Sequence, residues 1–280
     1  MITRRNFLSG AASAAALPFS MTAAPKPDVP VGKAEHCIFI WLGGGACHID
    51  MWDPKRKGDA KLKKAGSYYD AIETSVPGVK VCEHLKQCAG LMENFSLLRT
   101  INHNVIDEHA AATNRMHTGR PTSGTIVYPS IGSVVAHERG KANDSAPAYV
   151  VMGYPNLTRG PGFLGAKHGY IYLTDTESGP AGLVRSREIS TARNSGRERL
   201  LEHLRADYLK RNPNDSLIAD YDASISASQA LAGGEFMSAF NLKSESDSLR
   251  NSYGSEFGQR CMLARRLIQR GTRFIEVSFN

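Results

Sequence analysis

Several features that would define a protein class are scarce or absent in this sequence of 280 residues. The five cysteines include no Cys-x-x-Cys pair, which argues against a zinc ribbon or a thioredoxin-like centre. No block of lysines and arginines accompanies the formal charge of +7, so we expect no nucleic-acid partner. No apolar run reaches the roughly 20 residues that cross a bilayer, so we expect no membrane span in the mature protein. The spacing of Cys82 and Cys88 permits a disulfide between them but does not establish one.

The first 24 residues have the layout of an export signal. Arg4 and Arg5 precede Phe7-Leu8, a small apolar run extends from Gly10 to Pro18, and small residues follow as far as Ala24. Paired arginines of this kind resemble a twin-arginine signal, which predicts a periplasmic or otherwise exported protein that uses the twin-arginine export machinery. A chance Arg-Arg before an alanine-rich tail is the alternative. Residues 25–35 are predicted to form a linker.

The stretch from His36 to Pro54 is the one around which the rest of the chain is predicted to be organised. Its apolar part, as far as Leu42, indicates a central strand buried on both faces. Three glycines follow, and then His48, Asp50 and Asp53. Ligands of parallel sheets bind outside the carboxyl ends of the strands, so functional side chains are expected here. Two alternatives are a turn in which Asp50 caps a backbone amide, and glycines that only permit close packing.

The remaining chain alternates between apolar strand patterns and helical patterns. Strands are predicted at 95–101, 147–153 and 272–279, and helices at 83–94, 107–118, 130–138, 195–211, 215–232 and 245–270. Such alternation predicts an α/β fold with a mainly parallel sheet flanked by helices.

Short motifs in a fixed order resemble an exported family known as domain of unknown function 1501, in the alkaline phosphatase and sulfatase superfamily. They are Ile38 to Pro54, Leu97 to Thr100, Asn102-His103, His109 to Pro121, Pro129 to Ser133, Pro147 to Val151, and Arg265 to Val277. The resemblance implies an alkaline phosphatase-like core over residues 36–280. Family members continue past the equivalent of Asn280 into a Trp-Asp-x-His stretch, so it also implies a domain truncated at its C-terminus.

The same comparison argues against a sulfatase mechanism. Thr118-Gly119-Arg120 matches the end of the sulfatase nucleophile motif, but the nucleophile position nine residues earlier holds His109. Ala110 to Ala112 replace the motif's proline region, and glycines replace the acidic pair expected after the first strand. Position 109 is a histidine, so it cannot become a formylglycine.

The polar residues that remain suggest a metal or oxyanion site. We expect His48, Asp50 and His103 to bind a divalent ion, with Zn, Ca and Mg as the candidates. His109 is the expected catalytic residue, near a helix N-terminus that favours phosphate or sulfate. The alternative for His103 and His117 is that both are buried histidines with satisfied hydrogen bonds.

Two functions follow from these expectations. The first is a metal-dependent hydrolase acting on a small anionic phosphate or sulfate ester. The second is a non-catalytic protein of the same fold that binds carbohydrate, a polyanion or another surface protein.

Overall fold

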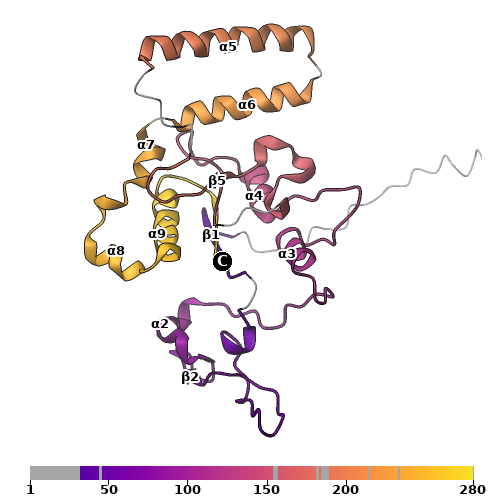
Figure 1. Ribbon diagram of the computed structural model, residues 1–280, viewed down its shortest axis with the longest axis vertical. Coiled ribbons are helices and arrows are strands. Elements are labelled where there is room, and N and C mark those ends of the chain that lie inside the picture. Colours follow the sequence, from indigo (N-terminus) through magenta and orange to yellow (C-terminus); the bar gives the residue numbers. More distant parts are fainter. Residues whose placement is uncertain are drawn as a thin grey trace, which may run out of the picture. The chain divides into compact units, whose positions relative to one another are not determined.

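The computed structural model describes residues 32–43, 46–153, 157–180, 183, 189–213, 215–232 and 234–279 (Figure 1). The chain divides into two compact units, residues 1–34 and 35–280, and every described helix and strand lies in the second. The predicted signal at residues 1–24 lies outside the described residues, as do Gly44 and Gly45. No helix among the described residues is long and apolar enough to cross a membrane.

Four parallel strands form the sheet that holds the domain together. They are β1 (Cys37–Trp41), β4 (Tyr149–Met152), β5 (Ile171–Leu173) and β6 (Phe274–Ser278), in the spatial order β1-β6-β4-β5. Glu276, in the middle of β6, is in register with Phe39 of β1 and Val151 of β4. The predicted α/β class with a parallel sheet is therefore confirmed.

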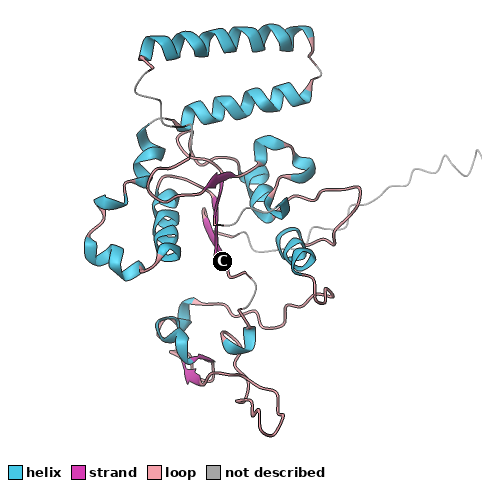
Figure 2. Cartoon of the chain, in the orientation of Figure 1, coloured by secondary structure: helices cyan, strands magenta, loops and turns pink. Residues whose placement is uncertain are grey.

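Helices cover both faces of this sheet (Figure 2). Side chains alternate along a strand, so Phe274, Glu276 and Ser278 share one face of β6. That face is covered by α3 (His109–Thr118) and α4 (Ile131–Arg139). Ile275 and Val277 point to the other face, where α9 (Glu256–Gln269) contributes Met262, Leu263, Ala264 and Leu267 to the main apolar core.

The position of β1 corrects the prediction of a central strand. Among the described strands β1 is at one edge of the sheet, and Ile38 and Ile40 are 38% and 48% exposed. The glycine after it serves close packing, because a Cβ on Gly43 would lie 2.9 Å from the carbonyl oxygen of Phe279. The amide of Phe279 donates to the carbonyl of Trp41 at 2.8 Å, which draws these two chain segments together.

Smaller elements complete the described part of the chain. An antiparallel pair, β2 (Ala71–Glu73) and β3 (Lys80–Cys82), packs with α2 (Lys86–Ala89) around Val81, Ala89 and Met92. Two long helices, α5 (Thr191–Arg211) and α6 (Ser216–Leu231), precede α7 (Gly234–Met237) and α8 (Asp247–Tyr253). Short 3₁₀ turns occupy His48–Asp50, Glu83–Leu85, Met92–Asn94, Leu157–Arg159, Gly162–Leu164, Ala166–His168, Ser238–Phe240 and Leu242–Ser244.

Three sequence predictions differ from the observed elements. The predicted strand at 95–101 is irregular, with Leu98 and Ile101 exposed, and its Arg99 side chain donates to the carbonyl oxygens of Trp52 and Lys80. The helix predicted at 83–94 is broken into α2 and two 3₁₀ turns. The helix predicted at 245–270 is two helices, because Gly254 adopts a φ of 74° that ends α8. All five cysteines are free, so Cys82 and Cys88 are not bridged.

Candidate functional site

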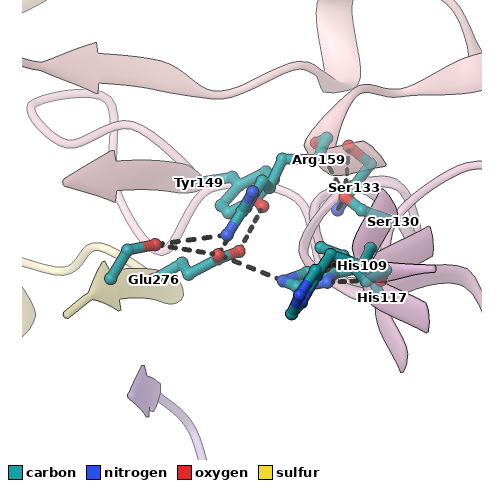
Figure 3. A network of polar contacts seen from close by, with 9 residues as sticks. His109, His117, Ser130, Ser133, Tyr149, Arg159 and Glu276 are labelled. Atoms are coloured by element: carbon teal, nitrogen blue, oxygen red, sulfur yellow. Dashed lines mark hydrogen bonds and ion pairs between the residues drawn. The ribbon is translucent and has the colours of Figure 1, made fainter. Parts of the chain in front are cut away.

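A network of polar side chains is buried against the inner strand β6, with Glu276 at its centre (Figure 3). Its members come from segments far apart in the chain: His117 from α3, Tyr149 from β4 and Arg159 from the turn that follows β4. The side chain of Glu276 is fully buried, and that of Arg159 is 3% exposed. A buried charge without a partner is strongly unfavourable, so the pairing of this carboxylate determines how the network is built.

Both carboxylate oxygens of Glu276 accept hydrogen bonds. Oε1 accepts from Arg159 Nε at 2.6 Å and lies 3.1 Å from His117 Nε2. Oε2 accepts from the Tyr149 hydroxyl at 3.3 Å. Arg159 also donates through Nη2 to Ser278 Oγ at 3.2 Å, which links the network to the carboxyl end of β6. The charge of Glu276 is thus neutralised inside the protein.

The surroundings of Glu276 keep it ionised. Burial alone raises the pKa of this carboxyl, but the hydrogen bond and charge of His117 and those of Arg159 outweigh that effect. Its pKa therefore lies below the ordinary glutamate value. Burial and the nearby Glu276 charge raise the pKa of Tyr149 far above its usual value, so Tyr149 stays a neutral phenol that donates.

The two ring nitrogens of His117 face acceptors. Nδ1 lies 2.8 Å from the carbonyl oxygen of Thr113, which has no proton to give, and Nε2 faces the ionised carboxylate of Glu276. Both ring nitrogens of His117 are therefore engaged within the protein. The rings of Phe39 and Trp41 both contact it in edge-on arrangements, with ring centroids at 5.7 and 4.6 Å. The prediction that His117 is a buried and satisfied histidine is confirmed.

Local sequence features hold Tyr149 and Arg159 in place. Ser130 caps α4 by accepting from the amide of Ser133, and its hydroxyl donates to the carbonyl oxygen of Arg159 at 2.8 Å. The Tyr149 ring lies directly against Gly132 of α4, where a Cβ would come within 2.3 Å of the ring. A glycine at this position is therefore required for the ring to reach Glu276.

A pocket of about 370 Å³ lies beside this network. Thr158, immediately before Arg159, forms part of its wall, and the first turns of α3 form another part through Glu108, Ala111 and Asn114. The segment at 121–128 closes it with hydroxyl groups, two aliphatic side chains and the ring of Tyr128. The lining thus combines hydrogen-bonding groups with one aromatic surface.

The expected ligands His48 and Asp50 lie in a 3₁₀ turn after β1. His48 is exposed. Asp50 is half-buried, and its Oδ1 accepts from the amide of Tyr68 at 2.6 Å, a contact that fixes the following loop. Asp50 therefore accepts from a backbone amide 18 residues further along the chain, and not from an amide of its own turn as the alternative interpretation expects.

His103 and His109 are both exposed. His103 Nδ1 accepts from the amide of Val105 at 3.3 Å, so the expectation that His103 is buried was wrong. His109 is the first residue of α3, but Glu108 already caps this end of the helix with a carboxylate that accepts from the amides of Ala110 and Ala111. The expected anion position at this helix N-terminus is thus filled by the protein's own carboxylate.

The four expected site residues do not gather with further ligands in the described part of the chain. Within it, no group of three or more His, Cys, Asp or Glu side chains is arranged to hold a metal ion. The divalent-ion site and the catalytic role of His109 stay predictions.

Sequence reasoning missed Glu276, Arg159 and Tyr149. One signal for Glu276 was present, because it is the single charge inside the apolar run from Phe274 to Val277, and a charge buried in a strand needs a partner. Arg159 had no such signal, since it follows a loop and only the folded chain brings it to β6.

These features define a mixed α/β domain with a parallel sheet, helices on both faces and a buried charged network on an inner strand. Residues 34–280 match the family model described as "Protein of unknown function (DUF1501)", and the chain belongs to this family. No curated protein and no solved structure matches the chain.

Proposed function

We propose that this protein is a non-catalytic binding protein whose ligand is a carbohydrate held in the pocket between α3 and residues 121–128. The pocket itself is the observation that supports the proposal. Its wall offers the amide of Asn114, the hydroxyls of Thr122 and Ser123, and the ring of Tyr128. Sugars combine hydroxyl groups with apolar ring faces, and this lining complements both.

The charges around the pocket favour a neutral sugar body over a free anion. Glu108 brings a carboxylate to the wall, and no lysine or arginine among the described residues lines it. The guanidinium of Arg120 lies over the Tyr128 ring, 6.0 Å from its centroid. A sulfate or phosphate substituent on the sugar can pair with Arg120 while the ring stacks on Tyr128.

Calorimetric titration of a panel of mono- and disaccharides, with and without sulfate or phosphate, tests the proposal. We expect at least one saccharide to bind the wild-type protein, and Tyr128→Ala to lose that binding. Tyr68→Ala is the matched control, because Tyr68 is 77% exposed and lies outside this pocket. Binding that Tyr128→Ala leaves intact would overturn the assignment, as would the absence of any binding.

A second candidate is a metal-dependent hydrolase of phosphate or sulfate esters on an alkaline phosphatase-like core. The parallel sheet, and the position of His48 and Asp50 in the turn that follows β1 along the chain, support this candidate. His103 and His109 belong to the same proposal. Under it the divalent ion is Zn, Ca or Mg.

Hydrolysis assays distinguish the two candidates. The hydrolase candidate predicts release of nitrophenol from nitrophenyl phosphate or sulfate with one of the three metals, and its loss in His48→Ala. His203→Ala, an exposed histidine on α5, is the control. If no ester is hydrolysed with any metal and a saccharide binds, only the binding function remains supported.

The proposal also includes export by the twin-arginine route, supported by the sequence of residues 1–24. Replacing both Arg4 and Arg5 with lysine is expected to retain the protein in the cytoplasm, as measured by cell fractionation. Export of the double variant at the wild-type level would contradict this part.

A further inference from the structure

The helices α5 and α6 form an antiparallel hairpin (Figure 1). Two side-chain contacts establish the antiparallel pairing, because a residue later in α5 contacts a residue earlier in α6. Arg205 forms an ion pair with Asp222 at 2.8 Å, and the Tyr208 hydroxyl donates to Asp215 at 3.1 Å. These contacts also identify the sides on which the two helices face each other.

Large apolar side chains of this hairpin are exposed instead of buried between the helices. Leu204, Leu217 and Tyr221 are 59%, 81% and 61% exposed. Leu200 and Tyr208, one turn on either side of Leu204, are exposed as well. We call this set the apolar flank, and it consists of Leu200, Leu204, Tyr208, Leu217 and Tyr221.

The apolar flank is continuous across both helices. Leu204 directly precedes Arg205, and Tyr221 directly precedes Asp222, so each lies about 100° around its helix from the contact between them. Because the helices run in opposite directions, this same rotation brings Leu204 and Tyr221 to the same side of the hairpin. The spacing of four residues then extends the surface from Leu204 to Leu200 and Tyr208, and from Tyr221 to Leu217.

A contiguous exposed apolar surface of this kind marks an interaction site, and the helix charges indicate the partner. From the sequence, α5 has six basic and three acidic residues, a net charge of +3. The helix α6, with its capping residue Asp215, has three acidic and no basic residues, a net charge of −3. The hairpin is therefore complementary in charge to a copy of itself turned so that each basic helix meets an acidic one.

We propose that the apolar flank is the docking surface for a second copy of this chain. In the resulting dimer α5 of one copy lies over α6 of the other, and the two hairpins form an intermolecular four-helix bundle. A two-fold axis places the same surface on both partners, as a closed dimer requires. The alternative, with α5 over α5, brings two basic helices together and is disfavoured.

Analytical ultracentrifugation of the full chain over a range of concentrations tests the proposal. We expect a concentration-dependent dimer of the 30.5 kDa chain. The double variant Leu204→Glu with Tyr221→Glu should sediment as a monomer with an unchanged circular dichroism spectrum. A wild-type monomer at every soluble concentration, or a double variant that still dimerises, would overturn the inference.

Two further variants distinguish association through the apolar flank from nonspecific hydrophobic association. Leu62→Glu removes an equally exposed leucine, 63% exposed and outside the hairpin, and should leave the dimer unchanged. Arg193→Glu with Arg197→Glu changes the net charge of α5 from +3 to −1 and should weaken the dimer at low salt. Loss of the dimer in Leu62→Glu, or a tighter dimer in the arginine double variant, would contradict the proposed arrangement.

Discussion

The strands β1 and β6 are neighbours of equal length and similar apolar character, yet they occupy opposite environments. All five residues of β6 are buried, including Glu276 and Ser278, whereas β1 leaves Ile38 and Ile40 exposed. The strand with a charge is therefore the inner one, and the strand without a charge is at the edge. A buried carboxylate requires partners from several elements, and only an inner strand is surrounded by enough of them.

The largest expected effect comes from breaking the charge pair on β6. Arg159→Met leaves the carboxylate of Glu276 buried without its closest donor, and we expect a loss of about 3–5 kcal/mol in the free energy of unfolding. Urea denaturation followed by circular dichroism measures it. Arg139→Met is the control, because its pair with Glu35 is exposed and is expected to contribute less than about 1 kcal/mol.

A double variant sharpens this prediction. Arg159→Met combined with Glu276→Leu removes both charges, so it should cost less than Arg159→Met alone. If the double variant were instead as unstable as the sum of the two single variants, the ion pair would not be the source of the effect.

Matched isoleucines test the comparison between the strands directly. Ile275→Ala on β6 removes a fully buried side chain and should cost about 2–5 kcal/mol. Ile40→Ala on β1 removes one that is 48% exposed and should cost about 1 kcal/mol or less. Equal losses in urea denaturation would mean that β1 is covered in solution.

Gly132 offers a smaller effect on the same network. A methyl group there collides with the ring of Tyr149, so Gly132→Ala should cost about 1–3 kcal/mol. Gly196→Ala is the control, since it adds the same methyl group in open space within α5 and should stabilise the protein by about 0.5–1 kcal/mol. A neutral Gly132→Ala variant would show that Tyr149 can reach Glu276 from another position.

The smallest effect is on the pH dependence of stability. The pKa of Glu276 is lowered in the folded state, so its contribution is fully present above the ordinary glutamate value of 4.5 and is lost as the pH falls through the lower folded value. Glu276→Gln removes this contribution, and its unfolding free energy should fall less steeply below pH 4.5 than that of the wild type. Parallel curves for the two proteins would contradict the lowered pKa.

Local patterns predicted most of the fold. The strands β1, β4 and β6 and the helices α3 to α6 lie where the apolar patterns predict them. Burial on one or two faces produces such a pattern of apolar residues within each short segment. The edge position of β1 could not be predicted in this way, since the strand order depends on pairing between residues about 240 positions apart. The prediction of a strand at 95–101 failed for a related reason. The apolar residues of this segment suit a strand, but no neighbouring strand pairs with it in the described chain.

The candidate site was less predictable than the fold. His48 and Asp50 were singled out because they follow a strand, a local property. The network around Glu276 joins residues 117, 149, 159 and 276, and no local pattern connects them. Of these, only His117 was recognised beforehand, and as a satisfied buried side chain.

The place of β6 between β1 and β4 has a consequence for how the chain acquires its structure. Neither of those two strands pairs with the other. Among the described strands β1 finds its partner only when residues 274–278 are available, whereas β4 also pairs with β5. During synthesis β1, and the edge of β4 that faces β6, therefore keep unpaired backbone groups until β6 has been made. We expect slow assembly of the sheet, and nascent chains that expose strand edges and need protection from aggregation.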